Sequence, residues 1–148
     1  MKIHQLSVFL ENKPGQLVGP CRKLAEAGIS ITTLSLADTE QFGILRLIVK
    51  DWEKAKQVLK DAGFVVNVTE MVAIEVPDRP GGLAEVLDIA EQGGINIEYM
   101  YAFTDKLGDK GVLVFRFDDP DKAIHVLGSA NFNIIERVDL FNRLGIIS

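Results

Sequence analysis

Two short loops contain the residues that are best suited to bind a ligand. They read ENKPGQL (residues 11–17) and PDRPGGL (residues 77–83), and both contain the pattern Pro-Gly-x-Leu. Asn12 precedes the basic residue in the first loop, and Asp78 precedes it in the second. The Asn12 carboxamide both donates and accepts hydrogen bonds, whereas an Asp78 carboxylate only accepts them and suits an ammonium group. Gly15 and Gly81 let the backbone approach a ligand closely.

Each Pro-Gly loop is expected to lead into a helix. The first N–H groups of a helix lack intrahelical partners, and together with the helix dipole they favour a carboxylate. Such a loop therefore has partners for both charges of a free amino acid. The alternative is structural, because Asn and Asp also stabilise turns without any ligand.

The remaining reactive residues do not form a catalytic or metal-binding pattern. His4, His125 and the single Cys21 cannot be arranged with a partner acid into a nucleophile and its base. The Cys-x-x-Cys motif of copper chaperones is absent. The acidic residues at 118–121 are typical of a helix start. We expect no catalytic residue, no metal site and no cofactor.

Composition and charge exclude further classes of function. A net charge of −5 and a pI of about 5.0 disfavour nucleic-acid binding, which normally needs a basic face. The strand KGVLVFRF (residues 110–117) resembles an RNA-recognition strand, but Val112 and Val114 occupy its base-stacking positions. No apolar run approaches the roughly 20 residues that span a bilayer. One cysteine excludes an internal disulfide, so we expect a cytoplasmic protein without nucleic-acid or membrane partners.

The chain is an internal duplication. Pro14, Gly15 and Leu17 recur 66 positions later, as do the residues around Gly28. After a two-residue insertion within residues 105–111, the offset becomes 68, and the matches continue to Phe64 and Phe132. Matches in order along nearly the whole unit indicate a repeat, not coincidence. We place the two domains at residues 1–70 and 71–148.

Each copy predicts the element order βαββαβ. An alternating strand precedes the loop, and an apolar stripe at helical spacing follows it, as at Leu83, Val86, Leu87 and Ala90. Gly28 and Gly94 predict the ends of these helices. Asp51 and Asp119 predict the N-caps of the second helices. Further strands are expected to begin at Ile29, Ile95, Gly43 and Gly111, and a last strand is expected after Phe64 and Phe132.

This order predicts an α+β protein of two ferredoxin-like units, in which the helices cover one face of each antiparallel sheet. The residues expected beneath the helices are Leu45, Leu47, Val49, Leu113, Phe115 and Phe117. The alternate strand residues, which point to the other face of the sheet, include Ile48, Val112 and Val114. These residues are too apolar for a face that is exposed to solvent. We expect that face to pack against another sheet, in this chain or in a second copy.

Two pairs of motifs resemble those of the ACT domain, a small regulatory domain of amino-acid metabolism. They are ENKPGQL with AGISI, and PDRPGGL with GGINI. The resemblance covers about residues 3–70 and 71–138 and leaves the tail FNRLGIIS outside. The chain looks like a stand-alone tandem ACT protein without an attached enzyme domain.

The resemblance implies amino-acid binding at an interface between two ACT units. In the serine-regulated ACT domain of phosphoglycerate dehydrogenase, the ligand is held by the Asn of the Pro-Gly loop and the Asn of the Gly-x-Asn segment. The positions that match are Asn12 and Ser30 in the first copy, and Asp78 and Asn96 in the second. The pattern is broken differently in each copy, so two sites should not be equivalent. The full predicted set is Asn12, Pro14, Gly15, Ser30, Asp78, Pro80, Gly81 and Asn96.

Three aromatic residues of the second copy, Tyr99, Tyr101 and Phe103, alternate along one expected strand. They predict packing between sheets. The alternative is an aromatic wall over the side chain of a ligand.

The resemblance implies a non-catalytic amino-acid sensor that acts allosterically on a partner enzyme, as a homodimer through sheet faces or edges. One alternative is a protein-binding regulatory subunit, similar to the small subunit of acetolactate synthase, with little or no ligand response. An enzyme on a ferredoxin-like scaffold is a third hypothesis, but it needs paired titratable groups that the sequence does not contain.

Overall fold

The computed structural model describes residues 2–103 and 110–143, so part of the predicted insertion and the last five residues lie outside it. The chain divides into two compact units. The first unit is His4–Thr69, and the second unit comprises the described residues from Glu70 onward together with Lys2 and Ile3. Lys2 joins the second unit through ion pairs with Glu70 (3.0 Å) and Asp121 (3.1 Å), which raise the pKa of its ammonium group.

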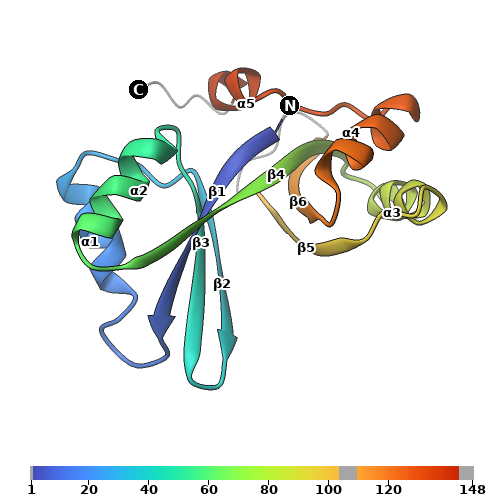
Figure 1. The fold of residues 1–148 in the computed structure, drawn as a ribbon. Helices are drawn as coiled ribbons and strands as arrows, with labels where there is room; N and C mark the ends of the chain where they lie inside the picture. Colours follow the sequence, from blue (N-terminus) through green and yellow to red (C-terminus); the bar gives the residue numbers. More distant parts are fainter. Residues whose placement is uncertain (1, 104–109, 144–148) are drawn as a thin grey trace. The chain divides into compact units, whose positions relative to one another are not determined.

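The first unit has the predicted order βαββαβ (Figure 1). Its strands form an antiparallel ladder in the order β2-β3-β1-β4. Helices α1 and α2 contact each other and pack on one face of this ladder. The elements are β1 (Lys2–Glu11), α1 (Val18–Glu26), β2 (Thr33–Thr39), β3 (Phe42–Ile48), α2 (Trp52–Asp61) and β4 (Val65–Pro77), of which the first unit contains the part up to Thr69.

The second unit repeats this order with a shorter last strand. Its ladder runs β4-β6-β5, and α3 contacts α4 as α1 contacts α2. The strand expected after Phe132 is reduced to one bridge between Ile74 and Ile134, since the chain then enters a helix. The further elements are α3 (Gly82–Gln92), β5 (Ile97–Ala102), β6 (Lys110–Phe117), α4 (Pro120–Ser129) and α5 (Arg137–Arg143).

The predicted helix signals are confirmed. The Asp51 carboxylate accepts a hydrogen bond from the Lys54 amide (3.2 Å), and Asp119 accepts one from the Lys122 amide (3.1 Å). Gly28 ends α1 with φ +71°, a left-handed conformation that glycine adopts without strain. These local signals set the helix lengths and therefore where each following strand begins.

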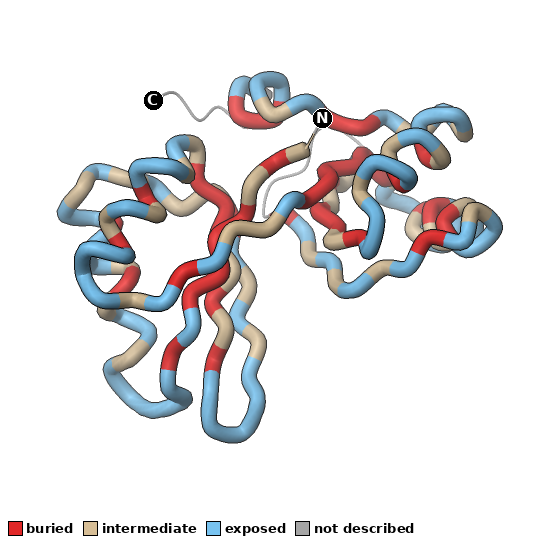
Figure 2. Tube along the Cα trace, in the orientation of Figure 1, coloured by how far each residue is buried: buried red, intermediate tan, exposed pale blue. Residues whose placement is uncertain are grey.

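Each unit has a core beneath its own pair of helices. In the first unit, Leu45, Leu47 and Val49 are buried together with residues of β1, α1 and α2, as predicted. In the second unit, Phe115 and Phe117 are buried, their rings stacked 5.3 Å apart, and Leu113 is partly buried. Figure 2 shows buried residues along the inner stretches of the strands.

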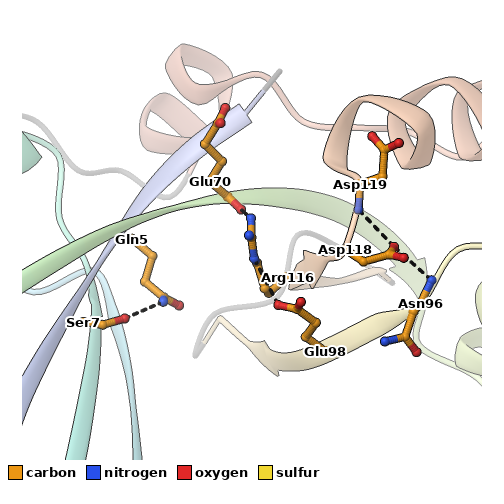
Figure 3. A network of polar contacts seen from close by, with 8 residues as sticks. All are labelled: Gln5, Ser7, Glu70, Asn96, Glu98, Arg116, Asp118 and Asp119. Carbon is orange, nitrogen blue, oxygen red and sulfur yellow. Dashed lines mark hydrogen bonds and ion pairs between the residues drawn. The ribbon is translucent and has the colours of Figure 1, made fainter.

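On the faces opposite the helices, Ile48, Val112 and Val114 are at most 1% exposed. Within the second unit, Arg116 donates to the Glu70 carbonyl (3.0 Å) and to the Glu98 carboxylate (3.2 Å), as drawn in Figure 3.

The two Pro-Gly loops differ in how they enter their helices. Helix α3 begins at Gly82, whereas α1 begins only at Val18, two positions later in the repeat. Gly82 is buried against the loop, and a Cβ at this position would collide with the Pro77 carbonyl oxygen. Gln16 occupies the matching position of the first copy. The absence of a side chain at Gly82 therefore allows the second loop to close directly onto its helix.

Gly82→Ala should destabilise the protein by about 1–3 kcal/mol, because the added methyl group meets backbone that cannot rotate away. Chemical denaturation measures this loss. Gly128→Ala in α4 is the control, since the nearest atom to its added Cβ is 3.7 Å away. The control should be neutral or stabilising by up to about 1 kcal/mol. Equal effects of the two substitutions would contradict the proposed close approach.

Candidate functional site

The first Pro-Gly loop is tied to the tip of the β2–β3 hairpin, which is exposed in Figure 2. The Asn12 backbone N–H donates to the Gln41 carbonyl (2.9 Å), and its side-chain Nδ2 donates to the Glu40 carbonyl (3.3 Å). The Lys13 ammonium pairs with the Glu11 carboxylate at 2.7 Å. The polar groups of this loop therefore already have partners within the protein.

A shallow, polar hollow of about 430 Å³ lies between this loop and the hairpin, and we call it the first-unit hollow. Five of its six lining residues are charged or carry a carboxamide. Pro14 and Gly15 do not line it, although Gly15 has φ +88° and makes the turn. The lining residues are Glu11, Asn12, Lys13, Glu40, Gln41 and Phe42.

The second Pro-Gly loop borders a different kind of hollow. This second-unit hollow has a volume of about 320 Å³ and a mainly apolar lining. Asp78 and Arg79 contribute its charged side chains, and the neighbouring Pro80 and Gly81 do not line it. The lining residues are Val76, Pro77, Asp78, Arg79, Leu83, Ala102, Phe103, Gly111, Val112 and Leu113.

The lining of the second-unit hollow comes from strands β4, β5 and β6 and from helix α3. Val76 is the next-to-last residue of β4, and it pairs with Gly111 of β6. Phe103 follows β5, and its backbone N–H donates to the Val112 carbonyl (2.9 Å), which continues the β5–β6 ladder by one residue. Leu83 lies in the first turn of α3. Strand pairing thus fixes most of the wall before any ligand is present.

Two residues of opposite charge, Asp78 and Arg79, line this hollow. Arg79 Nη2 lies 2.6 Å from Glu85 Oε1, and both side chains are about half exposed. Arg79 has five N–H donors, so the pair with Glu85 leaves others that can meet an anion. The second loop thus contributes a carboxylate and a guanidinium to a hollow with a mainly apolar lining.

Ser30 and Asn96 lie at the opposite ends of their own sheets from the loops. Asn12 follows Glu11, which pairs with Phe42, while Ser30 precedes Thr33, which pairs with Ile48. The six residue steps from Phe42 to Ile48 correspond to about 20 Å of strand. Within one unit, therefore, Asn12 and Ser30 cannot contact the same amino acid.

Asn96 has a structural role at its end of the sheet. Its backbone N–H donates to Asp118 Oδ1 (3.1 Å), and its carbonyl accepts from the Asp118 N–H (3.1 Å). The same Asp118 oxygen accepts from the Asp119 N–H (2.9 Å), as Figure 3 shows. Neighbouring Ile97 pairs with Phe117, whereas Asp78 follows the Pro77–Lys110 pair at the other end of β6. Asp78 and Asn96 could therefore contact the same amino acid only if one of them came from a second copy of the chain.

The sequence pattern missed most of the second-unit wall. Val76, Leu83 and Leu113 look like ordinary core residues, so their patterns did not mark them as a site. Of the three predicted aromatic residues, Phe103 lines the hollow and the two tyrosines do not. The useful signal was the comparison between copies, because Ala37 occupies the position that matches Phe103.

The other reactive side chains have structural surroundings. The His4 ring stacks on Trp52 with centroids 4.4 Å apart, and Cys21 packs against the first-unit core. Among residues 2–103 and 110–143, no group of three or more His, Cys, Asp or Glu side chains is placed to hold a metal ion. No helix in the described part of the chain is long and apolar enough to cross a bilayer.

The repeated βαββαβ unit with a Pro-Gly loop between its first strand and first helix defines the class of protein. The family model of the ACT domain pair matches residues 1–144, and the chain belongs to this family.

Solved structures agree with this assignment. A protein from Bacteroides thetaiotaomicron is 41% identical, with a TM-score of 0.89 over 95% of this chain and 96% of that one. The regulatory subunits of aspartate kinase from Thermus flavus and Thermus thermophilus are similar in fold, with 15% and 16% identity and TM-scores of 0.60 and 0.62. These two cover 88% and 86% of this chain, over 94% and 91% of their own length. A search of curated proteins found no match.

Asn12→Ala should lower the free energy of unfolding by about 0.5–1 kcal/mol, because it removes the side-chain bond to the Glu40 carbonyl. Asn96→Ala is the control, since the Asn96 side chain makes no hydrogen bond to a described residue and should cost less. Urea denaturation of both variants without added amino acid tests this difference. A larger loss for Asn96→Ala would show that the two residues were assigned the wrong roles.

Proposed function

We propose that this protein is a non-catalytic, amino-acid-binding regulatory protein of two ACT domains, residues 1–70 and 71–148, and that it works in the cytoplasm. The observation that carries the proposal is the second-unit hollow, which a carboxylate and a guanidinium line together with apolar residues. A free amino acid has the complementary arrangement, an ammonium and a carboxylate on one carbon with a side chain beyond them.

The charges of the second loop suit the two ends of a zwitterion. The Asp78 carboxylate is the proposed partner of the ammonium group, and Arg79 is the proposed partner of the carboxylate. We propose the second unit as the main site, because its hollow combines apolar residues with a carboxylate and a guanidinium, whereas five of the six residues that line the first-unit hollow are charged or carry a carboxamide. The wider predicted set, Pro14, Gly15, Ser30, Pro80, Gly81 and Asn96, stays a hypothesis.

Regulation requires that the ligand bind two states of the protein with different affinities. The Pro-Gly loop connects β4 to α3, so a ligand held there would change the relative stability of these states. A homodimer is the proposed unit that responds, and its proposed target is an enzyme of amino-acid metabolism. The fold similarity to regulatory subunits of aspartate kinase is consistent with such a target.

The outermost strand of the first unit supports association through sheet edges. Leu34 and Leu36 of β2 pair with Leu47 and Leu45, which places them on the helix-bearing side of the sheet. They are nevertheless 51% and 52% exposed. An outer strand with exposed apolar side chains is suited to pairing with another chain.

The same exposed residues favour one second candidate, a regulatory subunit that acts by binding a protein and responds little to amino acids. Phe42 at the hairpin is a further exposed apolar side chain, with 54% of its surface accessible. Capture of a defined enzyme from native lysate, unchanged by any amino acid, would favour this candidate.

Thermal unfolding of the full chain with each of the twenty amino acids at millimolar concentration tests the proposal. A ligand at 100 times its Kd adds about 2.7 kcal/mol of stability, which corresponds to a rise in Tm of about 5–10 °C. Asp78→Ala should abolish the shift, because the ammonium group loses its partner.

Asp88→Ala is the charge-matched control for this experiment. Asp88 is an exposed residue on the same α3 helix, and it does not line the second-unit hollow. Its substitution should leave the ligand-dependent shift intact. No shift with any amino acid in the wild-type protein would refute amino-acid binding.

A further inference from the structure

We infer that the second-unit hollow selects an amino acid with an uncharged, apolar side chain of about the size of leucine or phenylalanine, and that the first-unit hollow does not bind it. This inference rests on the proposed function and names the class of its ligand.

The apolar side chains that line the second-unit hollow from the helix-bearing side of the sheet are Val76, Leu83 and Leu113. None of these side chains can form a hydrogen bond. A hydroxyl, amide or charged group placed against such a wall would lose its hydration without gaining a partner. An apolar side chain would instead bury its surface there, which is favourable.

The two charged residues of the lining are neighbours in the chain. Asp78 and Arg79 are consecutive, and they follow Val76 and Pro77 at the end of β4. In the proposed complex, the ammonium and carboxylate groups lie on these two residues, and the ligand's side chain lies against the apolar residues of the lining. The polar residues therefore bind the ammonium and carboxylate groups of the amino acid, and the apolar residues contact its side chain.

The volume sets an upper limit on the side chain. About 320 Å³ is at the small end of the range of about 300–1,000 Å³ that is usual for ligand pockets. This suits a single amino acid better than a peptide or a nucleotide. An amino acid whose apolar side chain is one methylene shorter should bind at least about 10-fold more weakly.

The first-unit hollow lacks this wall although it has the same place in the repeat. Phe42 is its one large apolar side chain, and the other lining residues are Glu11, Asn12, Lys13, Glu40 and Gln41. Ala37 stands where the second unit has Phe103. The duplicated chain therefore offers an internal control for every residue of the proposed wall.

Gly111 gives the sharpest test, because it faces the hollow without a side chain. A Cβ at Gly111 would lie 3.8 Å from the Val76 carbonyl oxygen, an ordinary contact, so the strand tolerates a larger residue. Gly111→Val therefore fills part of the hollow. Gly43→Val is the matched control, because Gly43 holds the same repeat position and its nearest neighbour is the flexible Leu36 side chain at 3.6 Å.

Isothermal titration calorimetry on the full chain measures the preference. The probes are L-leucine, L-phenylalanine, D-leucine, L-serine, L-lysine and L-aspartate. We expect L-leucine or L-phenylalanine to bind at least 10-fold more tightly than the polar probes and D-leucine. Gly111→Val should weaken that binding at least 10-fold, and Gly43→Val should leave it within 2-fold.

A second pair of variants keeps the test valid if Gly111→Val misfolds, which circular dichroism would reveal. Leu83→Gln makes the wall polar and should weaken binding of the apolar probe, whereas Leu17→Gln, at the matching exposed position, should not.

The outcomes separate the two proposals. Tight binding of serine, lysine or aspartate in place of the apolar probes would overturn the inference while amino-acid binding stands. Loss of binding in Gly43→Val but not in Gly111→Val would also overturn it. No binding of any probe would reject the inference, and no response to any of the twenty amino acids would reject the proposed function as well.

Discussion

The antiparallel pairing of each unit's first strand with its third strand is the constraint on which the rest of the structure depends. In the first unit this pairing sets Glu11 opposite Phe42, and in the second it sets Pro77 opposite Lys110. In the first unit, the Pro-Gly loop consequently emerges beside the β2–β3 hairpin. The helices cover the sheet from one side, and the space left at this end becomes a hollow in both units.

Because the two copies share this framework, their differences isolate what the side chains contribute. The first copy places Gln16 after the Pro-Gly turn and begins its helix late, whereas Gly82 lets the second loop close onto α3. In the first loop, Asn12 bonds to the carbonyls of the hairpin. In the second loop, Arg79 pairs with Glu85, and Asp78 and Arg79 line a hollow together with apolar residues. Duplication thus preserved the scaffold and let the two loop ends diverge.

This division of roles is consistent with a regulatory protein. The paired strands hold the ends of each Pro-Gly loop in place. In general, a ligand that binds two arrangements of a protein with different affinities changes their populations, and this mechanism requires no reactive side chain.

Much of the fold could be predicted from the sequence, because its causes are local or periodic. The repeat, the order of elements, the Asp51 and Asp119 caps and the residues beneath the helices follow from patterns of two or 3.6 residues. The short last strand of the second unit could not be read in this way. The chain after Phe132 has the apolar residues of a strand, yet it pairs at a single bridge and continues into α5.

The candidate site divides along the same line. The sequence by itself determined that two Pro-Gly loops exist and that they carry Asn12 and Asp78. Only the tertiary structure decided that Ser30 and Asn96 lie at the far ends of their sheets, and that Phe103 and Gly111 meet Asp78 at one hollow. The physical reason is that helix and strand periodicity depends on near neighbours, whereas a binding hollow depends on strand register, which brings together residues that are distant in the chain.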